Sequence, residues 1–87
     1  MRTLLPRRSA CAMTELRDHE QLAETAYHAM YDATASYMVK AHFEDACLHL
    51  VRSIAAAREL GSLDDAARLE LRLDHVRKVY DHQFRGA

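Results

Sequence analysis

The sequence predicts an all-α protein, built as an antiparallel three-helix bundle with up-down-up topology. Alanine is abundant and strand-forming residues are scarce, so strands are not expected. Two Gly and one Pro in 87 residues leave little material for turns. Apolar residues recur at helical spacing in three successive segments. Because short loops would join these segments, neighbouring helices are expected to run antiparallel.

The clearest predicted helix runs from Phe43 to Gly61. Its apolar residues recur at alternating steps of four and three, which places them on one helix face: Phe43, Cys47, Leu50, Ile54 and Ala57. Acidic Glu44 and Asp45 lie in its first turn, as the helix dipole favours. Gly61 is expected to adopt positive φ and close the helix.

A preceding helix is expected to start after Thr14, which can cap it, and to end between Met38 and His42. One predicted apolar face comprises Leu22, Ala26, Met30, Ala33 and Tyr37, and a neighbouring face comprises Ala23, Tyr27, Tyr31 and Met38. Residues 1–13 are basic and free of acids, and they are interpreted as a disordered tail. The single domain is therefore expected to span residues 14–86.

The third predicted helix follows Ser62, which can cap it with Asp65 in a capping-box arrangement. Its predicted inner side holds Leu63, Ala66, Leu69, Leu73, Val76, Tyr80 and Phe84, and Gly86 ends it. Three acid-to-base pairs at i, i+4 mark a solvated outer side: Asp64–Arg68, Asp74–Lys78 and Asp81–Arg85. Leu71 and Val79 lie outside the main apolar face of this helix. Together with the wide apolar sector of the first helix, they predict self-association as a dimer.

Composition limits the classes of partner and the compartment. The net charge is −1, with basic and acidic residues well mixed, which argues against a nucleic acid or an anionic membrane as partner. No apolar run approaches the ~20 residues of a transmembrane helix. The two cysteines are interpreted as reduced thiols of a cytoplasmic protein. The preference for Arg over Lys and the high Ala content are typical of a bacterial protein.

Residues 27–60 contain the small residues Ala33 and Thr34, then Tyr37, Phe43 and Ala46, with Leu50 and Ser53 following. This pattern resembles a single tetratricopeptide-type helical hairpin. It places Ala41 at the hairpin turn, where the family usually has Gly. Met30 occupies the position that is usually Trp, and no Pro closes the second helix. The resemblance implies a helical surface for protein contacts, with no chemistry of its own.

No pattern of catalytic or cofactor-binding residues stands out, so no enzyme activity and no cofactor are predicted. Six histidines raise the question of metal binding. Three pairs at i, i+4 could each present two ligands: Glu15–His19, His28–Asp32 and Asp45–His49. The usual zinc and di-iron spacings are missing, so no metal ligand is predicted. Cys47 lies in an apolar stripe, where burial raises a thiol pKa and lowers its reactivity.

A helix-turn-helix DNA-binding regulator is an alternative. Ala57 and Gly61 have the small-to-Gly spacing of such a motif. The following helix, however, begins with Asp64 and Asp65, and these acids would meet the phosphates.

The function that the sequence predicts is a small non-enzymatic protein-interaction or regulatory module that self-associates. The protein partner is not identified by any motif. The expected contact surface lies on the first helix, because Tyr is enriched at interfaces. Its residues are Tyr27, Met30, Tyr31, Tyr37 and Met38. A His-based metal-binding helical protein is the second alternative to this function.

Overall fold

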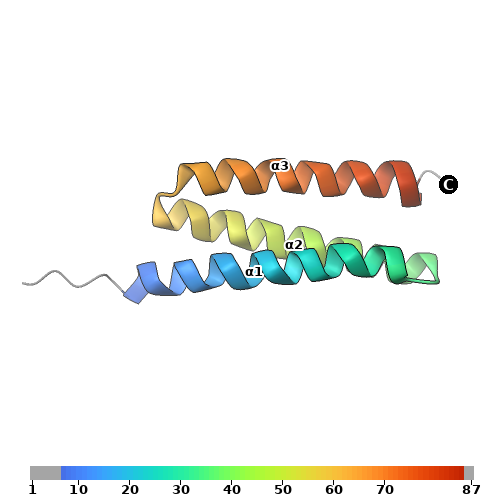
Figure 1. Ribbon diagram of the computed structural model, residues 1–87, viewed down its shortest axis with the longest axis horizontal. Coiled ribbons are helices and arrows are strands. Elements are labelled where there is room, and N and C mark those ends of the chain that lie inside the picture. Colours follow the sequence, from blue (N-terminus) through green and yellow to red (C-terminus); the bar gives the residue numbers. More distant parts are fainter. Residues whose placement is uncertain (1–6, 86–87) are drawn as a thin grey trace, which may run out of the picture.

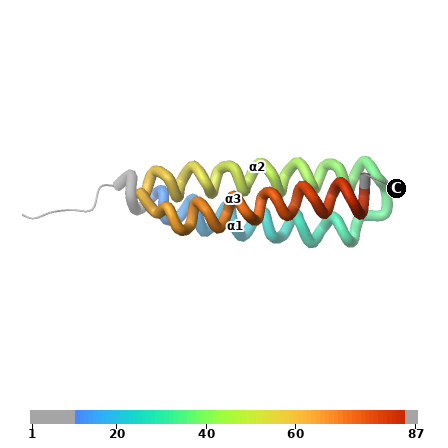
Figure 2. Tube along the Cα trace, turned by 90° about the horizontal axis from the view of Figure 1, so that it is seen from above, coloured from blue at the N-terminus to red at the C-terminus, as the bar shows by residue number. Residues whose placement is uncertain are grey.

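The computed structural model describes residues 7–85, and the side chains of residues 11–84 among them. It consists of α1 (Arg7–Asp32), α2 (Ser36–Leu60) and α3 (Leu63–Val79), followed by a π-helical segment, η1 (Tyr80–Arg85). The chain runs along α1, returns along α2 and runs forward again along α3 (Figure 1). Seen from above, all three helix axes lie along the same direction (Figure 2). The predicted all-α, up-down-up bundle is confirmed.

One continuous hydrophobic core lies between the helices. Small residues form much of it, and the fully buried alanines include Ala46 and Ala57. The core cluster comprises Ala12, Leu16, Ala23, Ala26, Ala46, Leu50, Ile54, Ala56, Ala57, Ala66, Leu69, Leu73 and Val76. Because the alanine side chain ends at Cβ, helices that meet through alanines can approach closely.

The start of α1 differs from the prediction. The helix begins at Arg7, not after Thr14, and Ala12 is buried in the core. The early start is explained by a contact with the C-terminal end of α2. Leu60, the last residue of α2, lies beside Met13 and Leu16 of α1 around one surface hollow. Extending α1 lets it cover the full length of α2. Of the predicted tail, residues 1–6 lie outside the described residues.

The prediction was also wrong about where the first helix ends. The break lies at residues 33–35, whereas it was expected between Met38 and His42. The backbone N–H groups of Met38 and Val39 both donate to the carbonyl oxygen of Ala35, at 3.0 and 3.1 Å, and so begin α2. The missed signal is the cluster Asp32, Thr34 and Ser36, since short polar side chains at such spacing favour a turn.

This shift affects the tetratricopeptide resemblance. Ala41, which the resemblance places at the hairpin turn, lies inside α2. The residue-by-residue assignment of that turn is therefore wrong. The segment 27–60 contains the end of α1, the connection and nearly all of α2.

The connection between α2 and α3 confirms the role predicted for Gly61. Gly61 has φ 75°, the left-handed conformation that glycine adopts most easily. Its N–H donates to the carbonyl of Arg58 at 3.0 Å, and the N–H of Ser62 donates to the carbonyl of Ala57 at 2.9 Å. This pair of hydrogen bonds is the Schellman motif, which satisfies carbonyls that a helix end leaves without partners.

The buried side of α3 agrees with the prediction at its centre and departs from it at the start. Ala66, Leu69, Leu73 and Val76 are buried as expected, whereas Leu63 is 74% exposed. Lys78 forms the predicted ion pair with Asp74, at 2.9 Å. The side chain of Arg85 lies outside the described residues, so the predicted Asp81–Arg85 pair does too.

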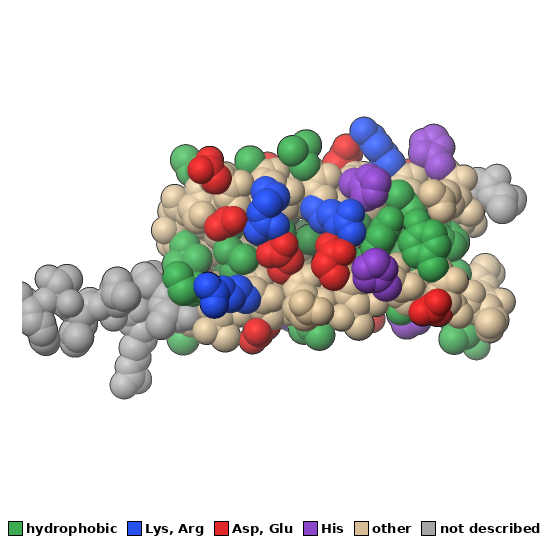
Figure 3. Space-filling view, viewed as in Figure 1, with side chains coloured by type: hydrophobic (Ala, Val, Ile, Leu, Met, Phe, Trp, Pro, Cys, Tyr) green, Lys and Arg blue, Asp and Glu red, His purple; other side chains and the backbone are tan. Residues whose placement is uncertain are grey.

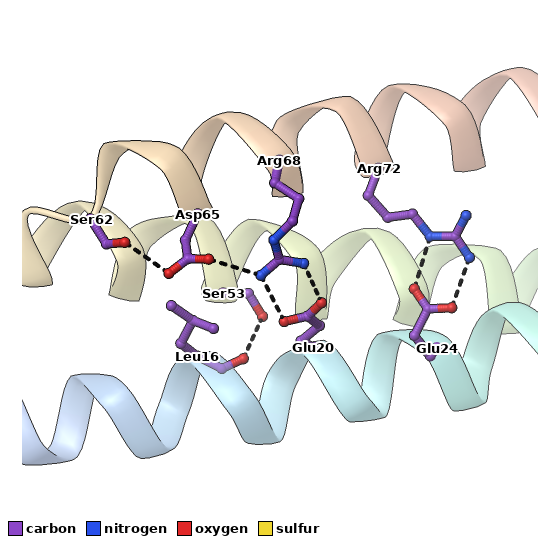
Figure 4. Close-up of polar contacts among 8 residues, drawn as sticks. All are labelled: Leu16, Glu20, Glu24, Ser53, Ser62, Asp65, Arg68 and Arg72. Atoms are coloured by element: carbon purple, nitrogen blue, oxygen red, sulfur yellow. Dashed lines mark hydrogen bonds and ion pairs between the residues drawn. The ribbon is translucent and has the colours of Figure 1, made fainter.

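Arg68 has other partners than the predicted Asp64. Its guanidinium binds Glu20 of α1 at 2.6 and 3.2 Å and Asp65 at 3.1 Å. One turn further on, Arg72 binds Glu24 through two hydrogen bonds of 2.8 and 2.7 Å (Figure 4). Both arginines therefore reach from α3 to α1, and these long side chains bridge helices that approach each other less closely than α1 and α2 do.

Candidate functional site

Aromatic side chains gather at the end of the bundle where α1 and η1 finish. The ring of Tyr31 in α1 meets that of Phe84 in η1 edge to face, with centroids 5.2 Å apart. On the other side of η1, Tyr80 stacks on Phe43 of α2, with centroids 4.0 Å apart and an interplanar angle of 11°. The π-helical segment thus contacts α1 through Phe84 and α2 through Tyr80.

A pocket of about 250 Å³ lies at this end of the bundle, and we call it the end pocket. Its walls come from the end of α1, the α1–α2 connection, the start of α2 and η1. They comprise Met30, Tyr31, Ala33, Thr34, Ala35, Ser36, Val39, Tyr80, Gln83 and Phe84. None of these ten residues is charged, although 29% of the whole chain is. Ligand sites for drug-sized molecules usually measure about 300–1,000 Å³. The end pocket is smaller than these sites, and its volume suits one large apolar side chain.

Tyr27 links the end pocket to the polar side of α3. Its hydroxyl shares a hydrogen bond of 3.2 Å with that of Tyr31, and this bond, then burial, raises the pKa of Tyr27. The guanidinium of Arg72 lies 4.6 Å from the centre of the Tyr27 ring, within cation–π range. The ring of His75 lies on the same side, 6.3 Å away. Figure 3 shows hydrophobic and histidine side chains gathered at this end of the molecule, next to the Arg, Lys, Asp and Glu side chains along the middle of the same view.

The structure brings together three of the five predicted contact residues. Tyr27 and Tyr31 are neighbours, and fully buried Met30 forms part of the wall of the end pocket. Tyr31 keeps 49% of its surface exposed, so it can still meet a partner. Tyr37 is 76% exposed and Met38 half-buried, and neither lines the end pocket. These two residues were expected on α1, but they lie in α2.

Sequence reasoning did not assign Tyr80 and Phe84 to the site. Both were expected on the inner side of the third helix, yet no contact with the tyrosines of the first helix was inferred. The predicted topology contained the signal. In an up-down-up bundle the first and third helices run parallel, so their C-terminal ends lie at the same end of the molecule (Figure 1). That places Phe84 beside Tyr31.

The histidines and Cys47 do not form a metal centre within residues 7–85. No three His, Cys, Asp or Glu side chains in this part of the chain lie close enough together to hold a metal ion. One close histidine pair exists, because His19 of α1 and His49 of α2 meet through their Nδ1 atoms at 2.8 Å. Burial raises the pKa of the half-buried Cys47 thiol, against the opposing effect of nearby Arg77. That lowers the fraction of reactive thiolate.

The arrangement of α2 and α3 does not favour the helix-turn-helix alternative. The two helices lie antiparallel, side by side along their whole length (Figures 1 and 2). In a helix-turn-helix the second helix crosses the first at about 90–120°, so that it can enter the major groove. A helix-turn-helix motif would need the residue at position 70 for packing between its helices. Glu70 is instead exposed and pairs with Arg58.

Comparisons of the chain with protein-family models, with curated proteins and with solved structures find no match. None of the described helices is both long and apolar enough to cross a membrane. The function therefore has to be argued from the geometry of the end pocket and the surfaces beside it.

Proposed function

We propose that this chain is a non-enzymatic protein-interaction module whose end pocket holds an apolar side chain of a partner protein. The observation that carries the proposal is the uncharged, aromatic lining of a pocket on the surface of a chain rich in charge. Interface cores are depleted in charged residues and enriched in Tyr, Phe and Met, and the end pocket has all three.

The polar groups around the end pocket support a protein segment as its occupant. Thr34, Ser36 and Gln83 line it together with the hydroxyl-bearing Tyr31. These groups can exchange hydrogen bonds with the backbone of a bound segment, while the aromatic walls cover its side chain. A few polar groups around an apolar pocket give orientation and specificity to binding.

The experiment is a selection of peptides from a random library on the immobilised protein, followed by affinity measurements on the selected peptides. We expect enrichment of peptides that share a large apolar residue. In Ala33→Trp, the new indole would fill the end pocket from the connection, outside the helices. This variant should bind the selected peptides at least tenfold more weakly.

Tyr37→Ala is the matched control, because it removes an exposed aromatic residue that does not line the end pocket. We expect it to bind the peptides as the original chain does. Equal binding to Ala33→Trp, or loss of binding in Tyr37→Ala alone, would place the contact elsewhere and defeat the proposal.

We also propose self-association, through a face different from the one predicted. Leu48, Val51 and Ala55 are exposed and share one face of α2 by their spacing of three and four. Val51 and Ala55 also line a hollow of about 290 Å³ between α2 and α3, together with Ile54, Leu73 and the ion pair of Arg58 and Glu70. An apolar stripe of this kind on a charged surface is typical of a contact with a second copy.

Sedimentation equilibrium tests the self-association. We expect a dimer for the original chain and a monomer for Val51→Glu. Leu71→Glu is the control, since Leu71 is also apolar and 73% exposed but lies on α3 and does not line the hollow. A chain that is monomeric at every concentration would contradict this part of the proposal and leave the end pocket unaffected.

A further inference from the structure

His19 and His49 form a contact that the proposed function does not use. They lie on α1 and α2, and both are half-buried. Their Nδ1 atoms are 2.8 Å apart, their ring centroids 5.0 Å apart, and their planes differ by 23°. Because the centroid distance exceeds the Nδ1–Nδ1 distance by about two ring radii, the rings meet edge to edge through these nitrogens. The contact is therefore a nitrogen-to-nitrogen hydrogen bond, and not a face-to-face stack.

The proton count decides whether this bond can exist. In the neutral pair, one ring carries its proton on Nδ1 and donates to the unprotonated Nδ1 of the other ring. One added proton converts one ring to imidazolium and leaves the other Nδ1 as acceptor, which makes a charge-assisted bond. A second added proton turns both Nδ1 atoms into donors. The bond is then lost and two positive charges face each other.

The surroundings of the pair oppose the second proton. Charged and titratable groups that face His49 are His19 from α1, and Asp45 and Arg52 from its own helix. Burial is the main cause that lowers the pKa of His49, followed by His19, while Asp45 acts in the opposite direction. His49 lines a groove between α1 and α2 together with Asp45 and His42. The α1 side of this groove is formed by Leu22, Thr25, Ala26 and Ala29. Among the described side chains of α1, residues 11–32, no cation lines this groove.

We propose that His19 and His49 form a proton-sensitive clasp between α1 and α2, closed at neutral pH and opened by acid. The direction follows from linkage. A histidine whose pKa is lower in the folded than in the unfolded chain stabilises the fold above the unfolded value of about 6.5. That stability decreases as the pH falls through the unfolded pKa towards the folded one. The middle of the α1–α2 contact thus responds to mild acid.

The test combines thermal unfolding with nitrogen-detected NMR of the imidazole rings, on the full chain between pH 7.5 and 5. We expect the unfolding midpoint to fall by an additional few °C in the original chain, relative to His19→Gln and His49→Gln. His82→Gln, which removes an exposed histidine of η1, should behave as the original chain does. The NMR spectra of the original chain should show opposite tautomers for the two rings at pH 7.5.

The NMR measurement needs no variant, so the proposal stays testable if a substitution prevents folding. The same tautomer in both rings, or an identical pH dependence in all four chains, would overturn the clasp. A rise of the unfolding midpoint on adding zinc, lost in both pair variants, would also overturn it and would assign the two nitrogens to a metal.

Discussion

The two sides of α1 are held in different ways. Towards α2 it presents small apolar residues such as Ala23 and Ala26, which are buried in the core. Towards α3 it presents Glu20 and Glu24, which bind arginines of that helix (Figure 4). We call the first contact the packed seam and the second the charged seam.

The difference teaches what sets the spacing of the helices. In the packed seam, the fully buried Ser53 of α2 donates a hydrogen bond of 3.3 Å to the backbone carbonyl of Leu16 in α1. A side chain as short as serine reaches a neighbouring backbone only when two helices are close. In the charged seam, the guanidinium groups of Arg68 and Arg72 span a wider separation. Packing therefore fixes α1 against α2, and charge aligns α3 with α1.

The largest effect is expected from enlarging a residue of the packed seam. Ala46 is fully buried, so Ala46→Leu would force α1 and α2 apart. Overpacking of this kind costs about 1–3 kcal/mol. Urea unfolding measures the loss, with exposed Ala41→Leu on the same helix as control. If the two variants were equally stable, the contact would not be close-packed.

A smaller effect is expected at Ser53. In Ser53→Ala the hydrogen bond to Leu16 is lost, and the net worth of such a bond is about 0.5–1.5 kcal/mol. Ser53→Val should cost more than Ser53→Ala, because it adds bulk to a side chain that is fully buried in the packed seam. Urea unfolding of both variants gives the order. A valine variant more stable than the alanine variant would show spare room in the packed seam.

The charged seam should contribute less and depend on salt. A double-mutant cycle between Glu24→Gln and Arg72→Met isolates the coupling of the pair, which we expect to be roughly 0.2–1 kcal/mol at low salt. Because screening weakens partly exposed charges, the coupling should shrink in 1 M NaCl. A coupling that stays the same at high salt would mean that packing, and not charge, joins these two side chains.

The smallest effect is a pH dependence at the start of α3. The Ser62 hydroxyl donates to the Asp65 carboxylate at 2.8 Å, and this bond, followed by Arg68, lowers the pKa of Asp65. Its stabilising effect is thus present above the unfolded pKa of about 3.9 and is lost as the pH falls through the lower folded value. Asp65→Asn should therefore lower the unfolding midpoint at pH 6 and not at pH 2. Asp64→Asn, which removes the neighbouring acid of the same first turn, controls for the helix dipole.

The parts of the fold that were predictable are those that local chemistry determines. Gly61 is a helix terminator because of its own conformational freedom, and the structure uses it so. The buried face of α3, from Ala66 to Val76, follows from helical spacing alone. Within residues 22–50 local chemistry decides less, since helix-forming residues continue on both sides of the break at residues 33–35. The matching of α1 and α2 along their length is a tertiary effect, and it explains why α1 starts earlier than predicted. The end of α1 had a local signal, the polar cluster Asp32, Thr34 and Ser36, which the prediction missed.

The candidate site was predictable in part for the same reason. Tyr27 and Tyr31 could be identified because they lie one turn apart on a helix that was correctly expected. Tyr37 was assigned to their surface only because the helix was extended too far. Phe84 required knowing which helix ends meet, and the π-helical geometry of η1 has no sequence signal that spacing rules capture.

Native-state hydrogen exchange tests the contrast between the two seams most directly. We predict the slowest exchange at buried backbone amides of the packed seam, such as those of Ala23, Ala46 and Leu50, because opening them requires separating close-packed helices. The amides of α3 around Arg68 and Arg72, where the charged seam lies, should exchange faster, and faster still in 1 M NaCl. Equal protection of α1, α2 and α3, unchanged by salt, would contradict the account.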